Sequence, residues 1–240
     1  MMQQDLPTRP ERGESIATAT LRVDMIADLV CPWCYLGKRR LDSALQAVLG
    51  PTRVSWLPFQ LNPDMPADGV SFEDYVQSRF GDSQNLEPAL EELRRAGAIE
   101  GINFRFDRIR RVPNTVNAHR LMKFAEIEGA DTSAVAEGIL AAFFEQGLDI
   151  SDRDVLATIG GACGLARQDV ARSLEEDWSL VRVETQEAEI RRGGVSGVPN
   201  FLINDRLVVV GAQPTAVLVS AFDRAMFGED SDQPVSASVH

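Results

Sequence analysis

The sequence predicts an α/β domain that is interrupted by an all-helical insertion at about residues 63–175. Three observations support this fold class. Residues 21–61 show a strand–helix–strand pattern, residues 71–192 show helical periodicity, and residues 198–227 return to two strands and a helix. Chains in which strand and helix patterns alternate in this way are typical of α/β proteins.

The first strand–helix–strand unit is short and clearly delimited. Residues 21–30 (LRVDMIADLV) are apolar enough for a buried strand. Apolar residues then recur at helical spacing from Cys31 up to Gly50-Pro51, which predicts a helix that ends there. Residues 52–61 alternate apolar and polar side chains and are followed by Asn62-Pro63, so they predict a second strand.

The helical block carries apolar stripes and recognisable helix ends. Residues 117–128 and 134–146 each place apolar side chains on one helix face. The segment Ser-Asp-Arg-Asp at 151–154 resembles an N-terminal cap. Gly193-Gly194 ends a charged helix that begins near Trp178.

Beyond the block, residues 198–203 and 207–210 are strand-like and are joined by Asn204-Asp205, which predicts a hairpin before the last helix. The two ends of the chain are polar, which predicts that they are disordered. We therefore expect four parts: a disordered leader (1–19), a discontinuous α/β domain (20–62 and 176–228), the helical insertion (63–175) and a disordered acidic tail (229–240).

The charge of the chain excludes some partners. A formal net charge of -12 and a pI near 4.7 argue against nucleic acid, which requires clustered lysine and arginine. The one basic run, Lys38-Arg39-Arg40, is short, and we expect it to form a solvated helix face. The first residues lack the apolar core of a secretory signal, and no segment approaches the roughly 20 apolar residues of a membrane span. We therefore expect a cytoplasmic protein without a membrane partner.

Two of the three cysteines form a Cys-Pro-Trp-Cys segment at the junction of the first strand and helix. If Cys31 caps the helix, Pro32 takes the first helical position, and Cys34 lies one turn further, within disulfide reach. The helix N-terminus favours the Cys31 thiolate, while Cys34 would be the resolving thiol. In a reducing compartment, such a pair is typical of redox or metal sites.

Two other interpretations of the pair are open. A metal site would need two more ligands, and the remaining candidates, Cys163, His119 and His240, form no second close pair, so we expect no metal. Alternatively, Cys31 and Cys34 could be inert buried thiols. The Pro-Trp between them at a strand-to-helix junction disfavours that alternative.

Four segments resemble the DsbA-family thioredoxin-fold oxidoreductases, specifically the FrnE-like branch. They are DLVCPWCYLGKRRL, RVPNTVNAHRLMKFA, the region around FEQGLDISDRDVL, and GVSGVPNFLINDRLVVVGAQP. The resemblance covers about residues 21–227. It implies a thioredoxin-like fold with an inserted helical domain.

The resemblance also implies a substrate-binding surface. Val198-Pro199 would be a cis peptide in a loop opposite the cysteines, with Val198 offering backbone hydrogen bonds to an extended substrate or to glutathione. The proline would keep metal ions away from the sulfurs. Pro32 and Trp33 are expected on the same surface. Because Trp33 stands where many relatives carry histidine, we expect a less oxidising pair.

Other residues carry two interpretations each. Asp28 could assist proton transfer from Cys34, or it could satisfy a loop amide. Asn114 and His119 could line the cleft that faces the cysteines, or they could be a helix cap and a polar residue beside an apolar stripe. Tyr35 could flank the cleft or pack into the core, and we expect Cys163 to be a small buried side chain.

Three functions are therefore weighed. The first is a cytoplasmic thiol–disulfide oxidoreductase in which Cys31 attacks and Cys34 resolves, acting on protein or small-molecule thiols and disulfides without a metal or organic cofactor. Glutathione is a candidate co-substrate. The second is a glutathione-dependent isomerase or transferase related to 2-hydroxychromene-2-carboxylate isomerase, although that class has serine at the first cysteine position. The third is a non-catalytic, chaperone-like peptide-binding module. The oligomeric state, monomer or homodimer, is left open.

Overall fold

The computed structural model describes residues 20–81 and 83–228, the side chains of residues 83–85 excepted. The predicted leader (1–19) and acidic tail (229–240) lie outside the described residues. Within the described ranges, no helix combines the length and the apolar character that a bilayer crossing requires.

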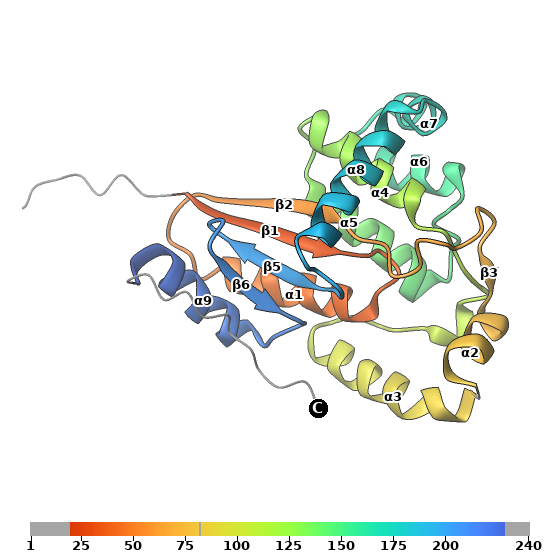
Figure 1. Ribbon diagram of the computed structural model, residues 1–240, viewed down its shortest axis with the longest axis horizontal. Helices are drawn as coiled ribbons and strands as arrows, with labels where there is room; N and C mark the ends of the chain where they lie inside the picture. The colour runs from red at the N-terminus through yellow and green to blue at the C-terminus, as the bar shows by residue number, and fades with distance from the viewer. Residues whose placement is uncertain (1–19, 82, 229–240) are drawn as a thin grey trace, which may run out of the picture.

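A four-stranded mixed sheet forms the centre of the fold (Figure 1). Its order is β2-β1-β5-β6, in which β1 pairs parallel to β2 and the other two pairings are antiparallel. The strands are β1 (Leu21–Ala27), β2 (Thr52–Pro58), β5 (Asn200–Ile203) and β6 (Leu207–Val210). The predicted strand–helix–strand unit and the C-terminal hairpin are therefore confirmed, and their strands meet in one sheet.

Two helices pack side by side along one face of this sheet, α1 (Pro32–Leu45) and α9 (Thr215–Phe227) (Figure 1). A third helix, α8 (Trp178–Arg192), packs against β2 and against the helical block. Helix α8 begins at the predicted Trp178 and ends directly before Gly193. It therefore bridges the sheet and the insertion.

The segment between β2 and α8 is mainly helical, as predicted. Its helices are α2 (Phe72–Phe80), α3 (Ser83–Ile99), the 3-10 turn η1 (Phe106–Arg108), α4 (Val116–Ile127), α5 (Thr132–Ala141), the π-helix η2 (Ala142–Gln146), α6 (Arg153–Ala162) and α7 (Arg167–Glu175). Asp152 caps α6 through its side chain, within the segment that resembled a cap.

The insertion is not purely helical, which corrects the prediction. Strands β3 (Val70–Ser71) and β4 (Arg111–Val112) form a small antiparallel ladder in which Val70 pairs with Val112. Two-residue strands are too short to produce an alternating pattern that a sequence window could detect.

The first strand ends earlier than predicted. Strand β1 stops at Ala27 because the carboxylate of Asp28 accepts the N–H of Leu29 at 2.7 Å, and the chain turns there toward Cys31. The N–H of Cys31 then donates to the carbonyl of Asp28 at 3.3 Å. This turn delivers the first cysteine to the start of α1.

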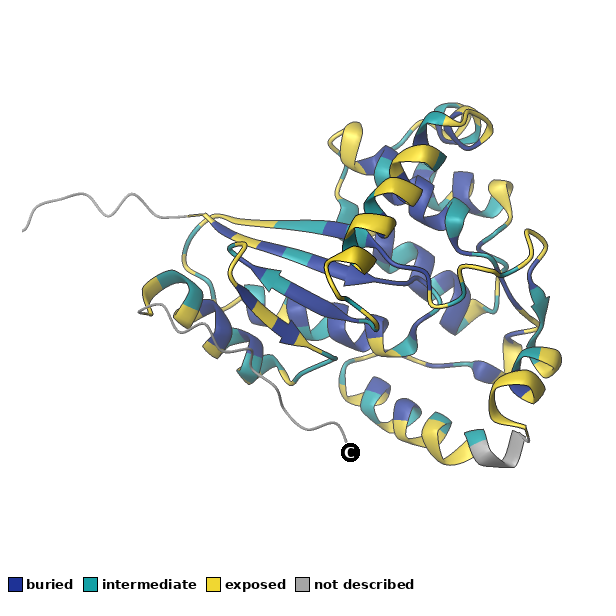
Figure 2. Cartoon of the chain, viewed as in Figure 1, coloured by how far each residue is buried: buried dark blue, intermediate teal, exposed yellow. Residues whose placement is uncertain are grey.

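One buried core runs through both parts of the chain (Figure 2). At the junction, the ring of Tyr35 from α1 stands edge-on to Phe104 and lies roughly parallel to Phe144, with centroid separations of 6.0 and 6.2 Å. Aromatic contacts of this kind contribute beyond the area that they bury. The helix that carries the cysteines is thus packed against the insertion.

Arg120 organises the helical block from its interior. Its guanidinium donates to Ser179 Oγ at 2.9 Å and to the carbonyls of Ser173 and Glu176 at 3.1 and 2.6 Å. Those carbonyls lie at the C-terminal end of α7, where helix carbonyls lack intrahelical partners. One buried cation therefore joins α4, α7 and α8.

Arg120→Leu should lower the free energy of unfolding by about 3 kcal/mol, because Ser179 Oγ and the carbonyls of Ser173 and Glu176 would lose the charged donor that joins them in a largely buried site. Denaturant unfolding followed by far-UV circular dichroism measures this difference. Arg172→Ala on α7 removes an exposed arginine and should cost less than about 0.5 kcal/mol. Equal effects of the two substitutions would contradict this role of Arg120.

Candidate active site

Cys31 is the N-cap of α1, as the sequence predicted. Its backbone is extended (φ -92°, ψ 113°), Pro32 follows at the first helical position, and the Cys31 sulfur accepts the N–H of Cys34 at 3.3 Å. A helix N-terminus offers unpaired N–H groups and the positive end of the helix dipole. Both features favour negative charge at the position that the Cys31 sulfur occupies.

Cys34 lies one turn deeper and is fully buried, while Cys31 is 3% exposed. Both are free thiols. Burial raises the pKa of the Cys34 thiol, and the adjacent Cys31 and the charge of Asp28 raise it further. The two cysteines therefore differ in environment, with one sulfur at the helix terminus and the other enclosed.

The loop before β5 lies opposite the first cysteine. The Val198–Pro199 peptide bond is cis, as the resemblance implied, and the Cys31 thiol points to the Val198 carbonyl at 3.9 Å. Helix α1 approaches this loop closely at Gly37. A Cβ atom on Gly37 would lie 3.1 Å from Pro199 Cγ and 3.2 Å from a ring atom of Phe201.

A cleft of about 780 Å³ opens beside this loop. Trp33, which is partly exposed, forms part of its wall together with Val198 and Pro199. The other lining residues are Glu92 from α3, the glycine-rich segment 193–197, Asn200, Val208, Val210 and residues 211–213. The structure thus brings together Trp33, Val198 and Pro199 of the predicted substrate surface, and β6 supplies an exposed sheet edge.

Asn114 and His119 do not line this cleft, which corrects the expectation that they face it. Asn114 accepts the N–H of Val116 at 2.9 Å and donates to the carbonyl of Met65 at 2.7 Å, so it supports the start of α4. His119 is buried, with Nε2 3.4 Å from Asp28 Oδ1. Its position on the inner face of α4, toward a buried carboxylate, keeps it from the surface.

Asp28 satisfies loop amides, one of the two interpretations that its position allowed. Its two carboxylate oxygens accept the N–H groups of Leu29 and Leu61, each at 2.7 Å. It is nevertheless close enough for its charge to act on Cys34. If Asp28 takes part in proton transfer, its carboxylate does so while both of its oxygens accept backbone N–H groups.

A profile of the DSBA-like thioredoxin domain matches residues 22–223, from the first strand to the last helix. The chain belongs to this DSBA-like thioredoxin domain family. The match confirms the resemblance to DsbA proteins and the thioredoxin-like fold with a helical insertion.

Solved structures agree with this assignment. The chain is 27% identical to a probable DsbA oxidoreductase from Streptomyces coelicolor, over 88% of this chain and 92% of that one, with a TM-score of 0.78. It is also similar to a 2-hydroxychromene-2-carboxylate isomerase (18% identity, 85% and 95% coverage, TM-score 0.65). A third neighbour is the cytosolic disulfide reductase DsbM from Pseudomonas aeruginosa, solved with GSH (19% identity, 85% and 95% coverage, TM-score 0.56). The last two share the fold.

In this DSBA-like domain, the basic run of α1 is not a solvated face, contrary to the sequence interpretation. Lys38 is buried and pairs with Asp42 at 2.6 Å and with Glu137 at 2.8 Å. Arg39 also pairs with Glu137, at 2.7 Å, and Arg40 pairs with Glu100 at 2.7 Å. Acidic residues of the insertion therefore neutralise the helix that carries the cysteines.

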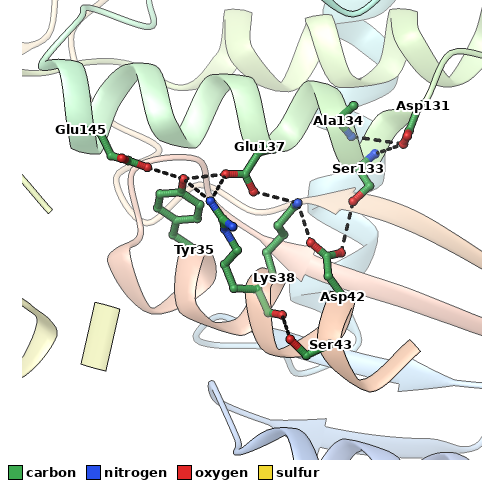
Figure 3. A network of polar contacts seen from close by, with 10 residues as sticks. Tyr35, Lys38, Asp42, Ser43, Asp131, Ser133, Ala134, Glu137 and Glu145 are labelled. Atoms are coloured by element: carbon green, nitrogen blue, oxygen red, sulfur yellow. Dashed lines mark hydrogen bonds and ion pairs between the residues drawn. The ribbon is translucent and has the colours of Figure 1, made fainter. Parts of the chain in front are cut away.

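Tyr35 belongs to the same network and not to the cleft wall (Figure 3). Its hydroxyl oxygen lies 2.7 Å from Glu137 Oε1 and 2.7 Å from Glu145 Oε1, so its single proton is donated to one of these two carboxylates at a time. Burial and these carboxyl groups raise the pKa of Tyr35 well above its ordinary value, so the phenol stays neutral. Figure 3 shows α1 tied in this way to the helices above it.

The acidic partners were missed by sequence reasoning because they lie far along the chain. One signal was present: Lys38 sits four residues after Cys34 and three before Leu41, on the apolar stripe of α1. A lysine on a buried stripe requires a carboxylate from elsewhere in the fold.

Cys163 ends α6 and is only partly buried, beside an apolar cavity of about 440 Å³ in the insertion. Burial and the charge of Asp131 raise the pKa of its thiol. It lies apart from the other two cysteines. Within residues 20–81 and 83–228, no group of three or more potential metal ligands is found.

Glu137→Gln should lower the free energy of unfolding by about 2 kcal/mol at pH 7, because Lys38 would lose one of two partners in a buried site. Burial acts to raise the pKa of Glu137, but Lys38 and Tyr35 outweigh it, and the folded pKa is lowered. The difference between wild type and variant should therefore be complete above about pH 5 and shrink as the pH falls through the lowered pKa.

Denaturant unfolding at several pH values measures this effect. Glu126→Gln removes a carboxylate from a more exposed pair with Lys123 and serves as the matched control, with an expected change below about 0.5 kcal/mol. A stability difference for Glu137→Gln that does not decrease in acid would show that the ion pair is not its source.

Proposed function

We propose that this protein is a cytoplasmic thiol–disulfide oxidoreductase that uses Cys31 and Cys34 as a redox pair. The observation that carries the proposal is the placement of Cys31 as the N-cap of α1, with its sulfur accepting the Cys34 N–H and facing the cis Val198–Pro199 loop. Membership in the DSBA-like family supports the same chemistry.

The reaction follows from the asymmetry of the pair. The Cys31 thiolate attacks a substrate disulfide, forms a mixed disulfide and releases one substrate thiolate. Cys34 then loses its proton, and its thiolate attacks the Cys31 sulfur. The Cys31–Cys34 disulfide forms and the second substrate thiolate leaves, so two electrons pass from the protein to the substrate. The reverse sequence oxidises a substrate dithiol. No metal or organic cofactor takes part.

The cleft favours polypeptide disulfides as substrates. An extended segment can pair with backbone groups at Val198 while Trp33 and the exposed side chains of β6 contact its side chains. Among the described residues that line the cleft, Glu92 is the one charged side chain. Glutathione carries two carboxylates, and among the described residues no cationic side chain lines the cleft to bind them. We therefore assign glutathione the role of a co-substrate that exchanges electrons with Cys31 and Cys34.

A glutathione-dependent isomerase or transferase is the second enzymatic candidate, since one structural neighbour is an isomerase. That neighbour shares the fold at 18% identity. The buried second thiol at Cys34, placed to resolve a mixed disulfide, favours dithiol chemistry instead.

Cys31→Ser should reduce dithiol-dependent reduction of a protein disulfide such as insulin to background, because a hydroxyl at this position does not ionise at neutral pH. Turbidity from the released insulin chains follows the reaction. Cys163→Ala is the matched control and should retain wild-type activity. Activity that survives Cys31→Ser would exclude the proposed mechanism.

Cys34→Ala should leave the first attack intact and block resolution, so that mixed disulfides at Cys31 accumulate. Non-reducing electrophoresis and mass spectrometry of the trapped adducts test this. If glutathione-dependent turnover persists in Cys34→Ala and no adduct is trapped, the isomerase or transferase candidate replaces the oxidoreductase. Peptide binding that survives the loss of both cysteines, without any catalysis, would instead support a chaperone-like module.

A further inference from the structure

His119 and Asp28 form a pair in the interior of the domain, and Asp28 lies three residues before Cys31. Their side chains are 5% and 1% exposed, and His119 Nε2 lies 3.4 Å from Asp28 Oδ1. His119 belongs to α4 of the insertion and Asp28 to the turn after β1. Within the described part of the chain, His119 Nε2 has no hydrogen-bond partner. The carboxylate is therefore the polar group that the imidazole faces.

The carboxylate is held in one place. Its two oxygens accept the N–H groups of Leu29 and Leu61, and the Asp28 carbonyl accepts the N–H of Cys31 at 3.3 Å. Asp28 is thus fixed directly before the redox pair. Burial is the main cause that raises the pKa of Cys34, and the charge of Asp28 adds to it. Neutralising that charge would favour the Cys34 thiolate.

A small cavity lies beside His119. Its volume is about 10 Å³, which is near the minimum that one water molecule needs, and Trp56 and Lys123 also line it. The indole N–H of Trp56 is buried and, among the described residues, has no hydrogen-bond partner either. His119 Nε2 and the indole N–H of Trp56 therefore lie beside a cavity of the size of one water molecule. A water molecule there could exchange a proton with the imidazole.

Three other charged groups on the elements around His119 have partners of their own. Lys123 on α4 pairs with Glu126 at 2.6 Å, and Glu187 on α8 pairs with Arg191 at 2.7 Å. Arg120 donates to carbonyl groups. Histidine is the residue type that ordinarily changes charge between about pH 5 and 8. His119 is therefore the ionisable side chain that faces Asp28.

We propose that His119 is a positioning residue for the step in which Cys34 attacks the mixed disulfide on Cys31. When the imidazole is protonated, it balances the carboxylate of Asp28, and the Cys34 thiolate forms beside a neutral pair instead of an isolated negative charge. In this step the Cys34 proton passes to water, a bond forms between the Cys34 and Cys31 sulfurs, and the substrate leaves as a thiolate. The inference rests on the proposed dithiol function.

A single-turnover reaction of the reduced protein with a chromogenic aromatic disulfide tests this inference, in a Cys163→Ala background. The first release of coloured thiolate reports the attack by Cys31, and the second reports the attack by Cys34. In wild type, the logarithm of the second rate should rise with pH with a slope below one between about pH 5 and 8, because loss of the imidazolium raises the pKa of Cys34 over this range.

In His119→Gln the slope should be one, and the second rate at pH 6 should be about tenfold lower than in wild type, which corresponds to one pKa unit. The first rate should change less than about twofold. Trp56→Phe removes the other nitrogen of the cavity without changing a charge, so it should keep the wild-type slope. His119→Asn provides a second uncharged variant.

Three outcomes separate the possibilities. A slope of one in wild type overturns the inference without any variant. Identical profiles in wild type and His119→Gln overturn it as well. The absence of the first thiolate release in wild type would contradict the proposed function itself, whereas either of the first two outcomes, with a normal first release, would contradict only the role of His119.

Discussion

The N-terminus of α1 is the constraint on which the rest of the site depends. Cys31 ends the turn after β1 and caps the helix, so its sulfur receives the Cys34 N–H while the next sulfur is buried one turn below. A cap and an interior position cannot offer the same environment. One backbone feature therefore produces both the nucleophile and the resolving thiol, and Gly37 lets the cis Val198–Pro199 loop approach the same helix.

The insertion holds this helix by charge as well as by packing. Lys38 and Arg39 pair with Glu137 of α5, and Arg40 pairs with Glu100 directly after α3. Tyr35 contacts the Glu137 oxygen that Arg39 also binds and one further oxygen, Glu145 Oε1 of η2. Removing one member of such a buried network leaves another charge without a partner. Asp28 and His119 form a second pair of ionisable side chains, which is buried in the interior of the domain. The insertion thus supplies groups on two sides of α1.

Local features were predictable and distant partners were not. The cap at Cys31, Pro32 at the first helical position and the strands on both sides follow from nearest neighbours in the sequence. Lys38 has one near partner, Asp42, but the carboxylates of Glu137 and Glu145 that contact Lys38 and Tyr35 lie about a hundred residues away. The local sequence therefore led to the wrong prediction that the basic run is solvated. For His119, helical spacing identified the buried stripe but not the carboxylate opposite it. The cis bond came from family resemblance, because about 5–6% of X-Pro bonds in folded proteins are cis.

The central claim is that Cys31 and Cys34 act as one reversible two-electron couple. Thiol labelling across a gradient of reduced and oxidised glutathione, read by mass spectrometry of each cysteine, tests it most directly. We predict that Cys31 and Cys34 lose their label together with a single midpoint below the roughly -120 mV of the strong oxidant DsbA, because Trp33 places no cation between them, while Cys163 stays labelled. Separate midpoints for Cys31 and Cys34, or a glutathione adduct on Cys31 without loss of the Cys34 thiol, would contradict the account.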